Sequence, residues 1–145
     1  MLNGIKTKAH PADLLENWKD GRIKLFVTQR LLLHRRDISP DLYRHGDYQP
    51  LEVTGEFAEC ALAFRRCFEG EEILVVVPRL CSRVGVPPLG EAWRDTAVSL
   101  PPGNQEHRGV SQNLFTGAKL DYSEGGSRLM LAKLLEHLPF AVLVR

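Results

Sequence analysis

The sequence predicts a mainly β protein, in which one or two α-helices precede an antiparallel β-sandwich. Hydrophobic residues recur with helical spacing up to Ser39, and Pro40 ends that pattern. From Tyr48 onward the spacing changes to the apolar–polar alternation that is typical of strands. The chain has 145 residues, enough to bury one core. We therefore expect an N-terminal helical segment over residues 1–46 and a C-terminal β-sandwich domain over residues 47–145.

Two helices account for the first segment. The run "PADLLENWKD" begins at Pro11, a residue favoured at a helix start, and Asp13 suits the positive N-terminal end of the helix dipole. Gly21 is expected to stop or kink this helix. A second helix is expected over residues 21–38, with arginines in its C-terminal half and Pro40 after its end.

The apolar arc of helix 21–38 is broader than one neighbouring surface requires. Because soluble monomers rarely expose a large apolar patch, we expect a two-fold homodimer through helix 21–38. The alternative is that residues 12–19 fold back over the same face. The residues expected at the self-association surface are Ile23, Phe26, Val27 and Leu31.

The second segment contains a series of strand-like runs separated by turns. The run "EILVVVPRL" is apolar almost throughout, so we expect it to be central and buried on both faces. The run "LMLAKLLEHLP" fits either a strand followed by a helical turn or one short helix. The other expected strands are "YQPLEVTG", "ECALAFRRCF", "DTAVSLP", "SQNLFTG" and "FAVLVR".

Composition excludes several classes of function. The net charge of +1 gives no basic surface for nucleic acid, and no apolar run is long enough to span a membrane. No signal peptide is visible, so the expected location is the cytoplasm. The three cysteines, Cys60, Cys67 and Cys81, are expected to be reduced, and they lack the C-x2-4-C spacing of a zinc site.

No motif predicts a catalytic, cofactor or metal site. The five histidines are scattered without metal-ligand spacing, and the acidic cluster at residues 69–72 lies at a predicted hairpin turn. No G-x-S-x-G turn surrounds a serine, and no phosphate-binding glycine loop is present. We therefore assign no catalytic residue, no cofactor and no metal ligand from the sequence.

Sugar binding is the remaining chemical prediction, because saccharide sites pair an exposed aromatic ring with polar groups. Trp93, with Arg94 beside it, follows a Pro/Gly-rich loop and is the first candidate for saccharide contact. Tyr122 is the second. The alternative is that Trp93 covers the sandwich core and its indole N–H binds a loop carbonyl.

The pieces "DGRIKL", "LYRHGDYQPLEVTGE", "VPRL" with "GEAWRDT", and "NLFTG" resemble, in order and spacing, the C-terminal portion of malto-oligosyltrehalose synthase. With further pieces, the resemblance extends over residues 13–145. It implies descent from the α-amylase-like glycoside hydrolase clan, in which a catalytic barrel precedes an amylase-type C-terminal β-sandwich. The region around residues 20–64 resembles the junction where the last barrel helix leads into that sandwich.

The resembled family isomerises the reducing-end linkage of a malto-oligosaccharide into a trehalosyl unit, using carboxyl groups on the barrel. A complete barrel needs roughly 200 residues or more, and only residues 1–19 precede the junction. We therefore expect a non-catalytic fragment, inactive alone, that braces a missing barrel in a pathway of trehalose biosynthesis. The alternatives are a stand-alone α-glucan-binding module and a subunit that completes a separately encoded barrel.

Overall fold

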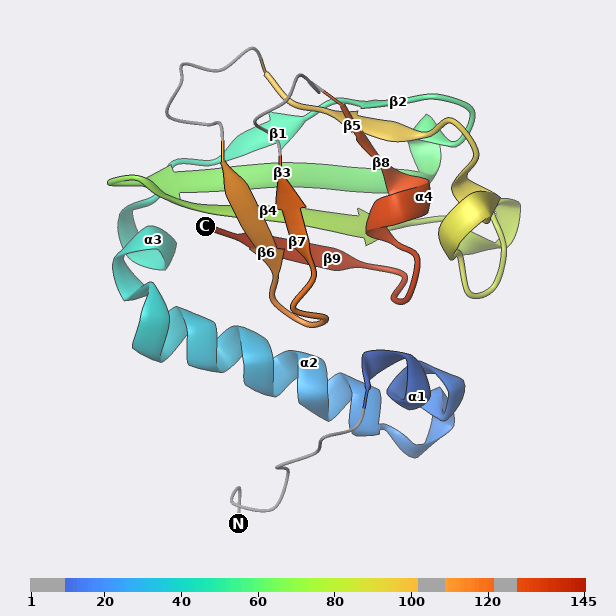
Figure 1. Cartoon of the computed structure of the whole chain (residues 1–145), viewed down its shortest axis with the longest axis horizontal. Coiled ribbons are helices and arrows are strands. Elements are labelled where there is room, and N and C mark those ends of the chain that lie inside the picture. The colour runs from blue at the N-terminus through green and yellow to red at the C-terminus, as the bar shows by residue number, and fades with distance from the viewer. Residues whose placement is uncertain (1–9, 102–108, 122–127) are drawn as a thin grey trace.

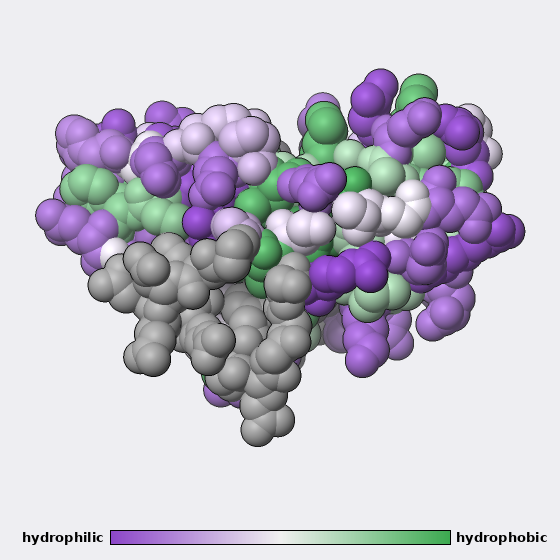
Figure 2. Space-filling model, turned by 90° about the horizontal axis from the view of Figure 1, so that it is seen from above, coloured by the Kyte–Doolittle hydropathy of each residue, from purple (hydrophilic) through white to green (hydrophobic). Residues whose placement is uncertain are grey.

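Two antiparallel sheets pack against each other, and a layer of helices covers the outer face of the larger sheet (Figure 1). The computed structural model describes residues 10–101, 109–121 and 128–145. Its strands and short helices confirm the predicted fold class, a mainly β antiparallel protein preceded by helices. Seen from the side of the smaller sheet, the surface mixes hydrophilic side chains with smaller apolar patches (Figure 2).

The larger sheet, sheet A, has the strand order β1-β3-β4-β9-β6-β7, and all its pairings are antiparallel. Strand β4 is the predicted "EILVVVPRL" strand, and its position between β3 and β9 confirms that it is central. Ile73 on one face and Leu74 on the other are both almost fully buried. The strands of sheet A are β1 (Gln49–Leu51), β3 (Ala61–Phe68), β4 (Glu71–Pro78), β9 (Ala141–Val144), β6 (Val110–Asn113) and β7 (Lys119–Asp121).

The smaller sheet, sheet B, contains β2 (Val53–Thr54), β5 (Ala97–Ser99) and β8 (Arg128–Met130). The expected single strand "YQPLEVTG" was wrong, because the chain leaves sheet A after Leu51 and Val53 pairs with Val98 in sheet B. Gly55 follows with a positive φ of 103°, and a Cβ there would lie 2.7 Å from the Cα of Thr96. A glycine is therefore required where this corner passes β5.

The helices of this layer begin and end close to the residues predicted from the sequence. Gly21, in the left-handed conformation at φ 79°, separates the first helical segment from the second, as expected. The predicted helix 21–38 is continuous, although its last turn is a wider π-helix, and Pro40 begins a new helix. The elements of this layer are α1 (Pro11–Glu16), the 3-10 turn η1 (Trp18–Asp20), α2 (Arg22–Leu33), the π-helix η2 (His34–Ile38) and α3 (Pro40–His45).

Short helical turns complete the fold around the sheets. Three of them are 3-10 turns, and the fourth follows directly from β8, so "LMLAKLLEHLP" is a strand followed by a helical turn. These turns are η3 (Ala58–Cys60), η4 (Cys81–Arg83), η5 (Gly90–Trp93) and α4 (Leu131–Leu134). Within the described part of the chain, no helix combines the length and apolar character needed to cross a membrane.

Apolar side chains form two separate clusters, one on each face of sheet A. The inner cluster lies between the sheets and includes Leu74, Val76, Trp93, Val98 and Leu143. The outer cluster lies between sheet A and the helical layer, and its buried members are Leu14, Phe26, Leu42, Ile73, Phe115, Leu138 and Val142. The two-sided burial of sheet A explains why β4 reads as a continuous apolar run.

Candidate binding groove

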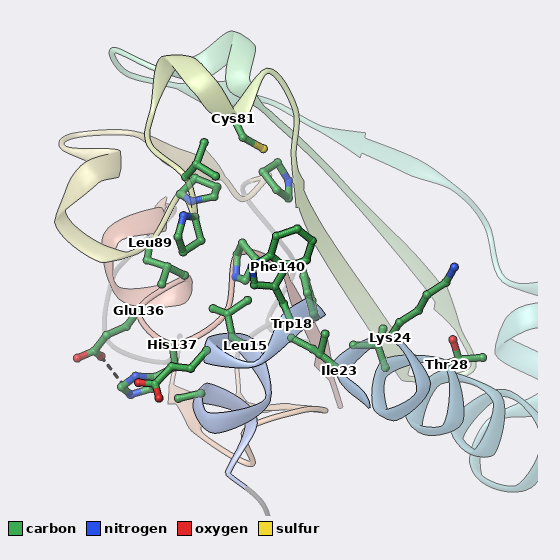
Figure 3. A pocket seen from close by; sticks show the side chains of 18 residues that line it. Leu15, Trp18, Ile23, Lys24, Thr28, Cys81, Leu89, Glu136, His137 and Phe140 are labelled. Carbon is green, nitrogen blue, oxygen red and sulfur yellow. Dashed lines mark ion pairs between the residues drawn. The ribbon is translucent and has the colours of Figure 1, made fainter. Parts of the chain in front are cut away.

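An apolar groove of about 910 Å³ opens where the first two helices meet the turns at the end of the sheets. One wall consists of α1, η1 and the start of α2. The opposite wall is the proline-rich loop 86–89, and the turn 136–140 closes one side (Figure 3). Its apolar lining includes Leu15, Ile23, Val27, Leu89, Pro139 and Phe140. We call this feature the groove, and its remaining lining residues are described in the next paragraphs.

The loop wall of the groove is fixed from inside the protein. The indole N–H of Trp93 donates a hydrogen bond to the Pro88 carbonyl at 2.9 Å, and Trp93 itself is fully buried in the inner cluster. The Gly90 N–H donates to the Leu135 carbonyl at 3.0 Å. These two hydrogen bonds hold the loop against the inner cluster.

Trp18 is the most conspicuous side chain of the groove. It lies on η1 between Ile23 and Phe140 in the close view (Figure 3), and 62% of its surface is exposed. A large aromatic side chain left in water inside an apolar groove is typical of a binding surface. The sequence placed Trp18 in the segment 12–19 that could fold back over helix 21–38, and did not identify it as part of a binding surface. Its signal was the polar and charged setting "ENWKDGR", which offers few apolar neighbours to bury an indole.

The rim of the groove carries opposite charges at its two ends. Lys24 and Thr28 lie at one end, on α2, and Glu136 and His137 lie at the other (Figure 3). The His137 Nε2 lies 3.9 Å from a carboxylate oxygen of Glu136, and both side chains are more than half exposed. The groove is therefore a hydrophobic surface with Lys24 at one end and Glu136 at the other, and Glu16 on α1 also lines it.

The residues predicted to contact a saccharide do not meet at the groove. Trp93 is 0% exposed, so its ring has no face on which a sugar could stack, and its indole bond is the one expected in the core-covering alternative. Arg94 is exposed, pairs with the Glu56 carboxylate and lies over the Phe57 ring at 5.6 Å. The hydrogen bond that the Arg94 guanidinium donates to the Glu56 carboxylate raises the pKa of Arg94. Tyr122 lies outside the described residues.

The residues predicted for self-association divide between two environments. Phe26 is 8% exposed and belongs to the outer cluster, where its ring centroid lies 6.2 Å from that of Phe115 in the turn after β6. Leu31 is partly buried against the outer cluster. Ile23 and Val27 are also partly buried there, but both line the groove. Helix α1 covers part of the same sheet face, because Leu14 is buried in the outer cluster.

The clusters of polar groups away from the groove have structural partners. Arg65 and Glu72 form an ion pair at 3.5 Å, and the Cys67 thiol lies 3.4 Å from a Glu72 oxygen. Burial, followed by the negative charge of Glu72, raises the pKa of Cys67 to about 11. A thiol with this pKa stays protonated at neutral pH and is a poor nucleophile.

The other polar cluster joins the helical layer to sheet A. The His34 Nδ1 lies 3.1 Å from the Tyr43 hydroxyl, and the Ser39 hydroxyl donates to the Glu71 carboxylate at 3.3 Å. Burial lowers the pKa of His34, against an opposing effect of Glu71. Among the residues that the structure describes, no group of three or more His, Cys, Asp or Glu side chains is arranged to hold a metal ion.

Comparison with solved structures found a mutant of maltooligosyltrehalose synthase from Arthrobacter ramosus. The two structures superpose with a TM-score of 0.59 at 25% sequence identity, and the match covers 92% of this chain. The same match covers 16% of the Arthrobacter chain, so this protein spans a small part of that enzyme's length. No protein-family model and no curated protein sequence matches the chain. The structural match supports a relationship to the malto-oligosyltrehalose synthase family.

Proposed function

We propose that this protein is a non-catalytic β-sandwich and helix unit that supports the catalytic barrel of a trehalose-forming enzyme. The observation that carries the proposal is the match of 92% of the chain to a region of maltooligosyltrehalose synthase. The sequence pieces that resemble this family run in the same order along almost the whole chain. Similarity in both sequence order and fold favours common ancestry over a shared sandwich architecture alone.

We propose a bracing role and not a catalytic one, because the chain is shorter than a complete barrel and catalysis of this type needs a pair of carboxyl groups held on a barrel. Glycoside hydrolases that retain configuration use two carboxyl groups about 5–5.5 Å apart. In a barrel enzyme such groups lie at the ends of barrel strands, and a barrel needs roughly 200 residues or more. This chain has 145 residues, and those that the structure describes form a sandwich and its helices. The carboxyl pair is therefore expected on another polypeptide or another part of the enzyme.

Two measurements test this function. The isolated protein is incubated with maltopentaose, and the reducing ends are counted; we expect no loss. The same protein, tagged and purified from its source cells, is expected to bring with it a barrel protein that does consume reducing ends and forms a trehalosyl product. A tagged Val75→Asp variant, which we expect to be unfolded, controls for non-specific capture.

Either of two results would contradict the proposal. The first is loss of reducing ends with the isolated protein, which would make this chain itself a catalyst. The second is purification from source cells, at native abundance, without any barrel protein of the α-amylase type. In that case the fold would be shared with the trehalose-forming enzyme but the role would not.

A further inference from the structure

We infer that a second copy of this chain covers the groove, in a two-fold dimer whose axis runs across the groove at Trp18. This inference concerns the self-assembly of the chain and goes beyond the proposed bracing function. It rests on the apolar lining of the groove and on the distribution of charge along its rim.

The lining of the groove is apolar, so the surface that covers it should also be apolar. Trp18 is 62% exposed, and the walls beside it are aliphatic, aromatic and proline side chains. Val86 on the loop wall is 82% exposed. Tryptophan is among the residues that most often dominate a protein interface when buried. Covering this surface with another protein face removes the indole and the proline loop from water together.

The charges at the two ends of the groove identify the kind of partner. Lys24 marks one end and Glu136 the other, with Trp18 between them (Figure 3). When a second copy is related by a two-fold axis that runs across the groove, each end lies over the opposite end of the other copy. Lys24 then meets Glu136 twice in the same interface. A surface of this kind is complementary to itself.

The alternative two-fold axis, along the groove, is unfavourable. It would place Lys24 over Lys24 and Glu136 over Glu136 around a hydrophobic centre, where like charges repel. The axis across the groove also brings the two Trp18 side chains together near the centre and sets the α2 helices of the two copies antiparallel. Of the residues expected from the sequence at the dimer interface, Ile23 and Val27 line the groove and remain part of that interface. Trp18 lies at its centre, and Phe26 is buried within its own subunit.

The experiment measures mass by sedimentation equilibrium of the whole chain at micromolar concentrations. We expect twice the monomer mass of 16.3 kDa. Trp18→Glu is expected to give a monomer with an unchanged circular dichroism spectrum, since the side chain is mostly exposed. The matched control is Tyr48→Glu, which changes an aromatic side chain that is 63% exposed outside the groove and should leave the dimer intact.

Charge reversal tests the direction of the axis. Lys24→Glu and Glu136→Lys should each raise the dissociation constant about tenfold, because the pair occurs twice in the interface. The two changes combined should restore association close to that of the parent. If the combined variant associates more weakly than either single variant, the axis does not run across the groove.

Three results would overturn the dimer. The first is a mass of 16.3 kDa at every concentration. The second is a dimer that persists in Trp18→Glu. The third is a monomer whose tryptophan fluorescence saturates on addition of maltoheptaose in the parent but not in Trp18→Glu, which would assign the groove to a saccharide. None of these results affects the maltopentaose and purification tests of the bracing role, so the two proposals fail separately.

Discussion

Replacing Trp93 with phenylalanine should destabilise the protein markedly, although both residues are aromatic. Trp93 is fully buried, and its indole N–H is the hydrogen-bond partner of the Pro88 carbonyl at 2.9 Å. Loss of the donor leaves a buried carbonyl unpaired, which costs about 1–3 kcal/mol. The smaller ring leaves a void of roughly 40 Å³, which costs about 1 kcal/mol at about 24 cal/mol per Å³. Together the free energy of unfolding should fall by about 3 kcal/mol.

The measurement is thermal and urea unfolding followed by far-ultraviolet circular dichroism, at a protein concentration low enough to keep the chain monomeric. For a domain of this size, about 3 kcal/mol lowers Tm by about 9 °C. Trp18→Phe is the matched control, because the same change at a mostly exposed position should alter stability by less than about 0.5 kcal/mol. Equal effects of the two substitutions would refute the assignment of Trp93 to the core.

Two further substitutions test sheet A and the helical layer. Val75→Asp places a charge on the central strand β4 against the outer cluster, and should lower the free energy of unfolding in urea by more than about 3 kcal/mol. The control, Val110→Asp on the exposed side of β6, should lower it by less than about 1 kcal/mol. Similar urea midpoints for the two variants would contradict the placement of β4. Burial lowers the pKa of His34 in the folded protein, so as the pH falls His34 is protonated in the unfolded chain before it is protonated in the folded one. The contribution of His34 to the free energy of unfolding is therefore complete above about pH 6.5 and is lost as the pH falls below that value. His34→Gln should therefore flatten the fall in urea midpoint between about pH 7 and about pH 5, and an unchanged slope would show that His34 does not contribute.

The sequence predicted the strands best where burial alone determines the pattern. Strand β4 is apolar on both faces because sheet A is covered on both faces, and its position could be predicted from residues 72–80 alone. The transfer of the chain between sheets after Leu51 could not be predicted. Leu51 and Val53 alternate as they would in one continuous strand, and only the pairing of Val53 with Val98 distinguishes the two cases. That pairing depends on a segment more than forty residues away.

The candidate site was harder to predict because exposure is a property of the whole fold. Both tryptophans lie in polar, charged sequence, yet Trp93 is buried and Trp18 is exposed. The loop 86–89 folds back over Trp93 through the Pro88 carbonyl, and no local pattern encodes that closure. The same loop forms the wall opposite Trp18. The groove therefore exists only after segments distant in sequence have assembled.

The position of β9 in sheet A bears on how the protein reaches its folded state. Of the six strands in this sheet, β9 is the last to be synthesised, yet it lies between β4 and β6 and joins the β6–β7 hairpin to the rest. Until residues 141–144 are in place, β4 has one open edge and apolar side chains on both faces. Such an edge readily pairs with other chains. We therefore expect the nascent polypeptide to depend on chaperones, and a deletion confined to these four residues to cause aggregation and not a mild loss of stability.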